Sequence, residues 1–365
     1  MLYSRNVDKP SHMIDPYSIY DLAGSMNVPV TKCKLTNGHS IIQLQDQKSL
    51  QVGCCLCVWY LFSTWSTFIN KVLIKEYHVS AEMLTMCHHF ISIILDFVVL
   101  TFPRSSTITG TWRMQRPCIR RIMWIVPLSL FSILAKTMTY WSYNAVPVSI
   151  AQTCKASQPL FNVVLAYMAY RSRFSFATYL TLIPIVFGVV MASVSEMGMN
   201  DLAFSGAMFA VTSSLLGVMQ SMYAKFLLRR QVVVDTVNLH FYSAFMSFAI
   251  NAPFVLMSTR AHQDNFVASF PFSKVLMCSM MHFVGSFCAS WVLGEVSELT
   301  FSIMGTMKRV VVILSAVLYF GNPVTFQSIF GTALAIGGVA GYQILKITEK
   351  EAKMLPLPLT VKTSE

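Results

Sequence analysis

Charged residues are scarce in this chain. Only 12% of its 365 residues are Asp, Glu, Lys or Arg, whereas 55% are hydrophobic. Because a soluble domain carries about 25% charged residues, this composition excludes an ordinary soluble domain and predicts a protein that crosses a membrane several times. The net charge of +11 does not indicate nucleic-acid binding, since most cations lie in short loops beside apolar segments, where cytoplasmic loops of membrane proteins carry them.

Enzyme signatures are also missing. The sequence has no GxSxG, HExxH or GxxxxGK[ST] motif, no paired acidic motif, and no long soluble loop that would hold a catalytic domain. The nine cysteines form no pair of CxxC motifs, and no histidine cluster completes a metal site. We therefore expect no enzymatic activity, no cofactor and no metal.

Ten apolar segments follow a polar N-terminal stretch. Each is close to the length of about 20 residues that a helix needs to cross a bilayer. They cover approximately residues 53–74, 81–102, 121–143, 148–169, 176–195, 203–227, 236–258, 272–294, 296–320 and 324–346. We therefore predict an all-α polytopic membrane protein with ten transmembrane helices, in which residues 1–50 and 347–365 are tails and residues 51–346 form the membrane domain.

Basic residues mark one side of this domain. They follow the second, fourth, sixth and tenth segments, whereas the loops on the other side hold few cations. The residues are Arg104, Arg113, Arg116, Arg120, Arg121, Arg171, Arg173, Arg229, Arg230, Lys346, Lys350 and Lys353. The positive-inside rule places cation-rich loops in the cytosol, so both termini are expected to be cytosolic. The even number of segments agrees with this orientation.

An internal repeat divides the membrane domain. Lys155 lies in the fourth segment and Lys308 in the ninth, which is the matching place five segments later. In the segment after each lysine, a phenylalanine precedes a glycine by 12 residues: Phe176 and Gly188, then Phe326 and Gly338. We predict two half-repeats, at about residues 51–195 and 203–346. An odd number of helices inverts the second half, as in secondary transporters whose substrate binds near the midplane.

Lys308 and Arg309 lie in the middle of an apolar run from Val296 to Phe320. Lys308 is about 12 residues, or about 18 Å, from either end, so its side chain cannot reach the membrane surface. A charge at this depth costs about 2.5–3.5 kcal/mol. An aqueous cavity together with an anionic ligand would offset that cost.

Lys155, Lys308 and Arg309 are the best candidates for a binding site. Matching places in inverted halves allow the two lysines to face a shared cavity, and Arg309 can line one side of it. Arginine offers a planar fork for phosphate oxygens and lysine a compact charge, so three cations suit a phosphate dianion. The alternative is pairing with buried acids, of which the segments hold few: Asp96, Glu295 and Glu298.

Lys136 and Thr139 lie in the third segment and allow two interpretations each. Lys136 either joins the same cavity or pairs with Asp96 on the neighbouring segment. Thr139, one turn further along, either donates its hydroxyl to the site or bonds a carbonyl of its own helix, as isolated threonines in such helices do.

Several other residues have structural interpretations. Lys71 is expected to extend outward to the membrane surface. The tryptophans are expected to lie mostly near segment ends, in aromatic belts at the interface: Trp59, Trp65, Trp124, Trp141 and Trp291. The histidines suggest either proton coupling or hydrogen-bonded core positions: His88, His89, His240 and His282. Small residues are expected to allow close packing of the fifth and tenth segments: Gly188, Ala192, Gly331, Gly337, Gly338 and Gly341.

Three motifs resemble a known family. Residues 307–312 (MKRVVV) and 331–342 (GTALAIGGVAGY) resemble the end of the triose-phosphate translocator family, and residues 155–161 (KASQPLF) resemble its central lysine motif. Residues 182–189 (LIPIVFGV) are most similar to the E subfamily of solute carrier family 35. The resemblance covers about residues 53–346.

The resemblance implies a ten-helix drug/metabolite transporter fold that works by alternating access. It also implies that Lys155, Lys308 and Arg309 hold phosphate and that Thr139 belongs to the site. Two positions depart from the family. Its histidine on the third helix falls at Lys136, and its tyrosine on the eighth falls at Gly285, so the part of the site that contacts the rest of the substrate differs.

We therefore predict an antiporter that exchanges a phosphorylated metabolite, such as a sugar phosphate, for phosphate or a nucleotide monophosphate. The alternatives are a nucleotide-sugar transporter of the Golgi or endoplasmic reticulum and a non-transporting membrane scaffold in secretory traffic. Because no organelle transit peptide opens the chain, a Golgi or endoplasmic reticulum membrane is expected. The predicted partners are a small anionic substrate and the lipid bilayer; the oligomeric state, a homodimer included, stays open.

Overall fold

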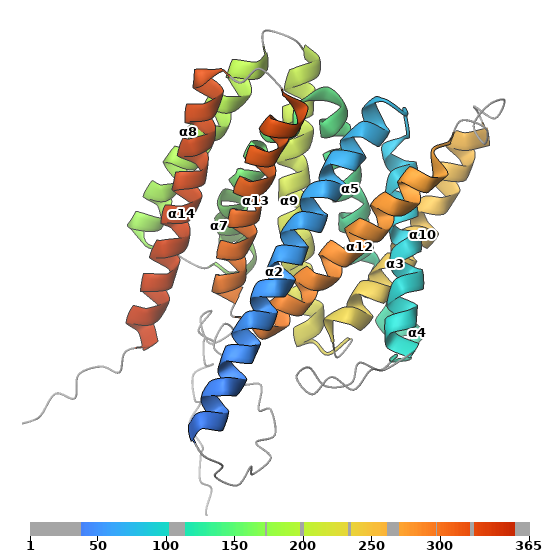
Figure 1. The fold of residues 1–365 in the computed structure, drawn as a ribbon, viewed down its shortest axis with the longest axis horizontal. Helices are drawn as coiled ribbons and strands as arrows, with labels where there is room; N and C mark the ends of the chain where they lie inside the picture. The colour runs from blue at the N-terminus through green and yellow to red at the C-terminus, as the bar shows by residue number, and fades with distance from the viewer. Residues whose placement is uncertain are drawn as a thin grey trace, which may run out of the picture.

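The computed structural model describes residues 38–101, 114–171, 174–197, 201–232, 235–260, 270–296, 298–321 and 325–354. These residues are almost entirely helical and include no β-strand. The helices are α2 (Gly38–Lys75), α3 (Ala81–Thr101), α4 (Ile119–Met123), α5 (Val126–Ala145), α6 (Val148–Cys154), η1 (Lys155–Ser157), α7 (Gln158–Tyr170), α8 (Phe176–Met197), α9 (Asp201–Arg229), α10 (Thr236–Arg260), α12 (Phe272–Glu295), α13 (Glu298–Phe320) and α14 (Phe326–Met354). Figure 1 shows them packed side by side in one bundle.

Eight helices in the described part of the chain are long and apolar enough to cross a membrane. They confirm the prediction of an all-α polytopic membrane protein. The predicted fourth segment is not among them, because it divides into α6, the 3-10 turn η1 and α7. The segment α13, which carries Lys308 and Arg309, is not among them either.

Two helices extend past the predicted membrane domain. Helix α2 begins at Gly38, inside the predicted N-terminal tail, and α14 continues to Met354, inside the predicted C-terminal tail. Both extensions are polar but contain no proline, and they are rich in Gln, Leu, Lys and Glu, which favour helix. The ends of the apolar runs were therefore a poor guide to where these two helices end. Residues 1–37 and 355–365 of the predicted tails lie outside the described residues.

Helix pairing follows the division of the chain into two halves. Helix α2 packs against α12 and α5 against α9, while α3 packs against α10 and α8 against α14. If α4–α5 and α6–α7 each count as one segment, a shift of five segments turns the α2–α12 pair into the α9–α5 pair. The same shift returns the α3–α10 and α8–α14 pairs to themselves. This pattern supports the predicted repeat, which stays a prediction.

Glycines bring α8 and α14 into close contact at one edge of the bundle (Figure 1). A Cβ added at Gly188 would lie 2.5 Å from the backbone nitrogen of Ala335 and from the carbonyl oxygen of Gly331. A Cβ at Gly331 would lie 2.6 Å from the backbone nitrogen of Ala192. The predicted packing role is therefore confirmed at these positions. Gly337 takes no part, since a Cβ there would meet nothing within 4 Å.

Candidate functional site

The break in the fourth segment creates the backbone part of the site. In an α-helix the carbonyl of residue i accepts from the N–H of residue i+4. Pro159 has no N–H, so the carbonyl of Lys155 loses that partner. Two side chains from other helices replace it: Arg309 Nη1 donates to the Lys155 carbonyl at 3.0 Å, and Ser214 Oγ donates to it at 3.2 Å.

Lys155 is placed at the centre of the bundle by α6. Every residue of α6 is buried, and Lys155 follows its last residue, Cys154. The Lys155 ammonium donates to Thr139 Oγ1 on α5 at 2.8 Å. It also lies 5.9 Å from the centre of the ring of Tyr143, which is one turn after Thr139 on the same helix. Thr139 in turn donates to the Ala135 carbonyl at 2.8 Å. Thr139 therefore bonds its own helix, as one interpretation predicted, and its oxygen accepts from Lys155; donation of its hydroxyl to a substrate stays a prediction.

Arg309 ties α13 to the broken segment. One guanidinium nitrogen donates to the Lys155 carbonyl, and another donates to Oε1 of Gln158, the first residue of α7. Both acceptors are neutral. The planar fork of the arginine is thus held in place by groups that do not cancel its charge.

Lys308 lies against α2. Its ammonium lies 5.2 Å from the centre of the Trp59 ring, at a distance typical of a cation–π contact. Trp59 is only 5% exposed, so its predicted place in an interfacial belt is wrong. Next to it, the Tyr60 hydroxyl donates to the Met304 carbonyl at 2.5 Å, which holds α2 against α13.

The cations Lys155, Lys308 and Arg309, called the cation clamp below, repel one another. Lys155 is subject to the charges of both other residues, and Lys308 to that of Arg309. Among the side chains that the structure describes, no carboxylate forms an ion pair with any of the three. Asp96, the predicted alternative partner, instead accepts a hydrogen bond from His240 at 2.6 Å. The side chains of Glu295 and Glu298 lie outside the described residues.

Lys136 belongs to a second polar cluster. Its ammonium lies 3.1 Å from His89 Nε2, and the alternative prediction that it pairs with Asp96 is wrong, because Asp96 bonds His240. His88 contacts Ser279 Oγ at 2.8 Å and Asn70 Oδ1 at 3.0 Å, and its ring stacks on that of His282 at 4.6 Å. Lys136 is one turn from Thr139 on α5, so this cluster borders the clamp.

Sequence reasoning missed several of the groups that complete the site. Gln158 could have been predicted as part of the site, because it is a polar residue in an apolar segment and lies in the lysine motif. Tyr143, Ser214 and Trp59 carried no comparable signal, since their roles depend on which helices pack together. Gly285 is a close-contact position: an added Cβ would lie 3.0 Å from Ser63 Oγ on α2, so this glycine allows α12 to approach α2.

Buried cations inside a bundle of membrane-spanning helices, with no ion pair among the described side chains, are typical of a pathway for a substrate or an ion. The chain belongs to the Triose-phosphate Transporter family, whose family model matches residues 50–343. It is therefore a multi-pass membrane transporter and not an enzyme.

Three relatives of the chain are plastid translocators by name. The chain is 29% identical to phosphoenolpyruvate/phosphate translocator 3, chloroplastic, of Oryza sativa subsp. japonica over 315 residues, which cover 83% of this chain and 76% of the relative. It is 28% identical to the triose phosphate/phosphate translocator, non-green plastid, chloroplastic, of Brassica oleracea var. botrytis, covering 84% and 75%. It is 25% identical to the chloroplastic triose phosphate/phosphate translocator of Spinacia oleracea, covering 85% and 76%.

Proposed function

We propose that this transporter is an antiporter that exchanges a phosphorylated metabolite for phosphate or a nucleotide monophosphate, and that Lys155, Lys308 and Arg309 bind the phosphate group. The observation that carries the proposal is the cation clamp itself: three cations on α13 and the broken segment, with no described carboxylate paired to them. The names of the relatives, which are phosphate translocators, support the same class of substrate.

The clamp is arranged so that a phosphate can replace its neutral acceptors. Arg309 now donates to a carbonyl and an amide oxygen, and a phosphate oxygen forms stronger, charge-assisted hydrogen bonds with the same fork. Lys155 is held by the Thr139 hydroxyl, which leaves its charge intact. Lys136 then faces the part of the substrate that lies beyond the phosphate, toward His89.

Exchange follows from the charge of the clamp. A bound dianion offsets most of the repulsion among the three cations, and the loaded carrier can then rearrange between its two open states. An empty carrier keeps that repulsion within a membrane, where uncompensated charge is costly. We propose that this difference makes return of the empty carrier slow and exchange obligatory. In this mechanism the inverted halves, about residues 51–195 and 203–346, each contribute one lysine.

Exchange of labelled phosphate by the purified protein in liposomes tests the proposal. Lys308→Ala is expected to reduce exchange at least about a hundredfold, because one of three phosphate contacts at a buried site is lost. Lys225→Ala removes an exposed lysine on α9 and is expected to leave exchange unchanged. If Lys308→Ala exchanges phosphate as well as the parent protein, the site is assigned wrongly.

The substrate beyond phosphate can be found by thermal stability. A ligand at about 100 times its dissociation constant stabilises a protein by about 2.7 kcal/mol, so sugar phosphates, phosphoenolpyruvate and nucleotide sugars can be compared directly. Stabilisation by a nucleotide sugar alone would favour the alternative transporter, and no stabilisation by any phosphate compound would favour the scaffold.

Orientation and compartment stay predictions. Cytosolic termini follow from the basic loops after even-numbered segments, and a Golgi or endoplasmic reticulum membrane follows from the sequence resemblance to solute carrier family 35. The relatives are chloroplastic by name and do not support that compartment.

A further inference from the structure

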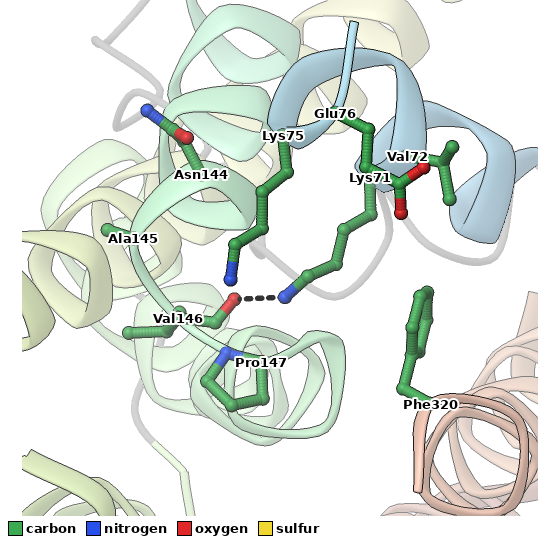
Figure 2. A pocket seen from close by; sticks show the side chains of 9 residues that line it. All are labelled: Lys71, Val72, Lys75, Glu76, Asn144, Ala145, Val146, Pro147 and Phe320. Carbon is green, nitrogen blue, oxygen red and sulfur yellow. Dashed lines mark hydrogen bonds between the residues drawn. The ribbon is translucent and has the colours of Figure 1, made fainter. Parts of the chain in front are cut away.

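A cavity of about 440 Å³ lies where α2 ends. It is lined by the end of α2 with Glu76, by the end of α5 and its connection to α6 (residues 144–147), and by Phe320 at the end of α13. Figure 2 shows these three elements around it. Its volume is within the range of about 300–1,000 Å³ that is usual for small-molecule sites.

Two lysines on successive turns of α2 give this cavity a positive charge. Lys71 is only 7% exposed, and its ammonium donates to the Val146 carbonyl at 2.8 Å. Lys71 is therefore covered by protein where α5 meets α6, and its predicted extension to the membrane surface stays a prediction. Lys75 is exposed, and Figure 2 shows its ammonium directed to the same wall as that of Lys71.

One acid lines the same cavity. Glu76 is part of the lining together with the two lysines, so the described lining residues hold two positive charges and one negative charge. In Figure 2 its carboxylate lies on the side of Val72, apart from both ammonium groups. This excess of positive charge attracts an anion into the cavity, because low-dielectric walls concentrate the field there.

The cavity lies at the ends of the two elements that carry the cation clamp. Pro147 borders the cavity, and Lys155 follows it by eight residues, a rise of about 12 Å if helical. Phe320 borders the cavity, and Arg309 precedes it by eleven residues, a rise of about 17 Å. An anion in the cavity is therefore about two to three helical turns from the clamp.

We propose that this cavity, with Lys71 and Lys75, is a vestibule site that binds the phosphate group of a soluble substrate before it moves to the clamp. The proposal rests on the proposed function, because it supplies the substrate of that function on one face of the membrane. Lys71 has a second effect there, because its hydrogen bond to the Val146 carbonyl joins α2 to the connection before α6. An anion that binds this ammonium weakens that bond and so loosens the contact between α2 and the connection.

Kinetics measured separately on the two faces test the vestibule. The full chain is placed in phosphatidylcholine vesicles of known orientation, and exchange of labelled inorganic phosphate is followed from each side. Lys75→Gln is expected to raise KM about fivefold on the face where α2 ends and to leave KM on the other face and the saturated rate unchanged. Lys71→Gln combined with Lys75→Gln is expected to raise KM on that face further.

Lys274→Gln is the matched control. Lys274 is an exposed lysine near the same end of α2, in contact with Tyr77, but it does not line the cavity. It is expected to leave KM unchanged on both faces. Equal effects of Lys274→Gln and Lys75→Gln would show a general surface charge effect and overturn the vestibule. Equal changes in KM on both faces, or an unchanged KM for Lys75→Gln, would also overturn the vestibule.

Two further experiments distinguish phosphate binding in the vestibule from phosphate binding in the clamp and from binding of a lipid headgroup. With Lys308→Ala as background, stabilisation by inorganic phosphate at low salt is expected to persist and to be lost when Lys75→Gln is added. If no phosphate binding remains in that background, the vestibule is wrong even where the clamp is right. If the effect of Lys75→Gln appears only in vesicles that contain anionic lipid, the cavity holds a lipid headgroup and the proposal is overturned.

Discussion

At the scale of single residues, the carbonyl of Lys155 explains why the clamp assembles. Pro159 lacks the N–H that would donate to this carbonyl in a continuous helix. Arg309 on α13 and Ser214 on α9 donate to it instead. One proline therefore changes a continuous segment into a broken one and provides the acceptor that positions the arginine. The cost of leaving a backbone carbonyl without a partner in a membrane gives this arrangement its stability.

At Thr139, the effect of the hydroxyl can be measured separately from the effect of the shape of the side chain. Thr139→Val keeps the shape of the side chain but removes the hydroxyl that accepts from Lys155. A hydrogen bond contributes about 0.5–1.5 kcal/mol, so KM for phosphate is expected to rise about twofold to tenfold. Thr139→Ser keeps the hydroxyl and should remain within about twofold of the parent. Equal exchange kinetics of Thr139→Val and the parent would show that the hydroxyl does not position the lysine.

The residues of the clamp were accessible from sequence because charge in an apolar run is rare and costly. Lys155, Lys308 and Arg309 follow from that cost alone. The contacts around them do not. Trp59 and Tyr143 are ordinary aromatic residues of apolar segments, and only the packing of α2 and α5 shows that they border lysines. The pairing of Asp96 with His240 also joins helices that are distant in sequence.

At the scale of helices, close packing of α8 and α14 depends on glycine at few positions. The sequence pattern identified the two helices, because glycines recur on both. It did not distinguish Gly337 from Gly331, since the rotation of a helix about its axis is set by its neighbours. The break between α6 and α7 was missed for a related reason: the apolar run from 148 to 169 continues through it, and only Pro159 indicated an interruption.

Gly188→Val is expected to destabilise the transporter by about 1–3 kcal/mol, the usual cost of overpacking. Its Cβ would lie 2.5 Å from backbone atoms of α14, and backbone cannot move aside as a side chain can. Thermal unfolding in detergent measures the effect. Gly337→Ala is the matched control and should not lower stability, because its Cβ meets nothing. Equal stability of the two variants would contradict the packing described for α8 and α14.

At the scale of the whole molecule, helices from distant parts of the chain meet around the clamp. Residues 155–158 and α13 supply the cations, and α5 supplies Thr139. The all-α polytopic class and the order of the segments followed from hydropathy, since a helix that spans the bilayer needs a long apolar run. Which helices pair did not follow from it, because apolar surfaces of similar composition do not specify their partners.

The transporter is expected to change the face to which its site opens only when an anion fills the clamp. Uptake of labelled phosphate into liposomes that are either preloaded with unlabelled phosphate or empty tests it most directly. Because the empty clamp keeps its repulsion, we expect rapid uptake into preloaded liposomes and almost none into empty ones, with the rapid uptake abolished by Lys308→Ala. Equal uptake into preloaded and empty liposomes would contradict obligatory exchange, and unimpaired uptake by Lys308→Ala would contradict the clamp.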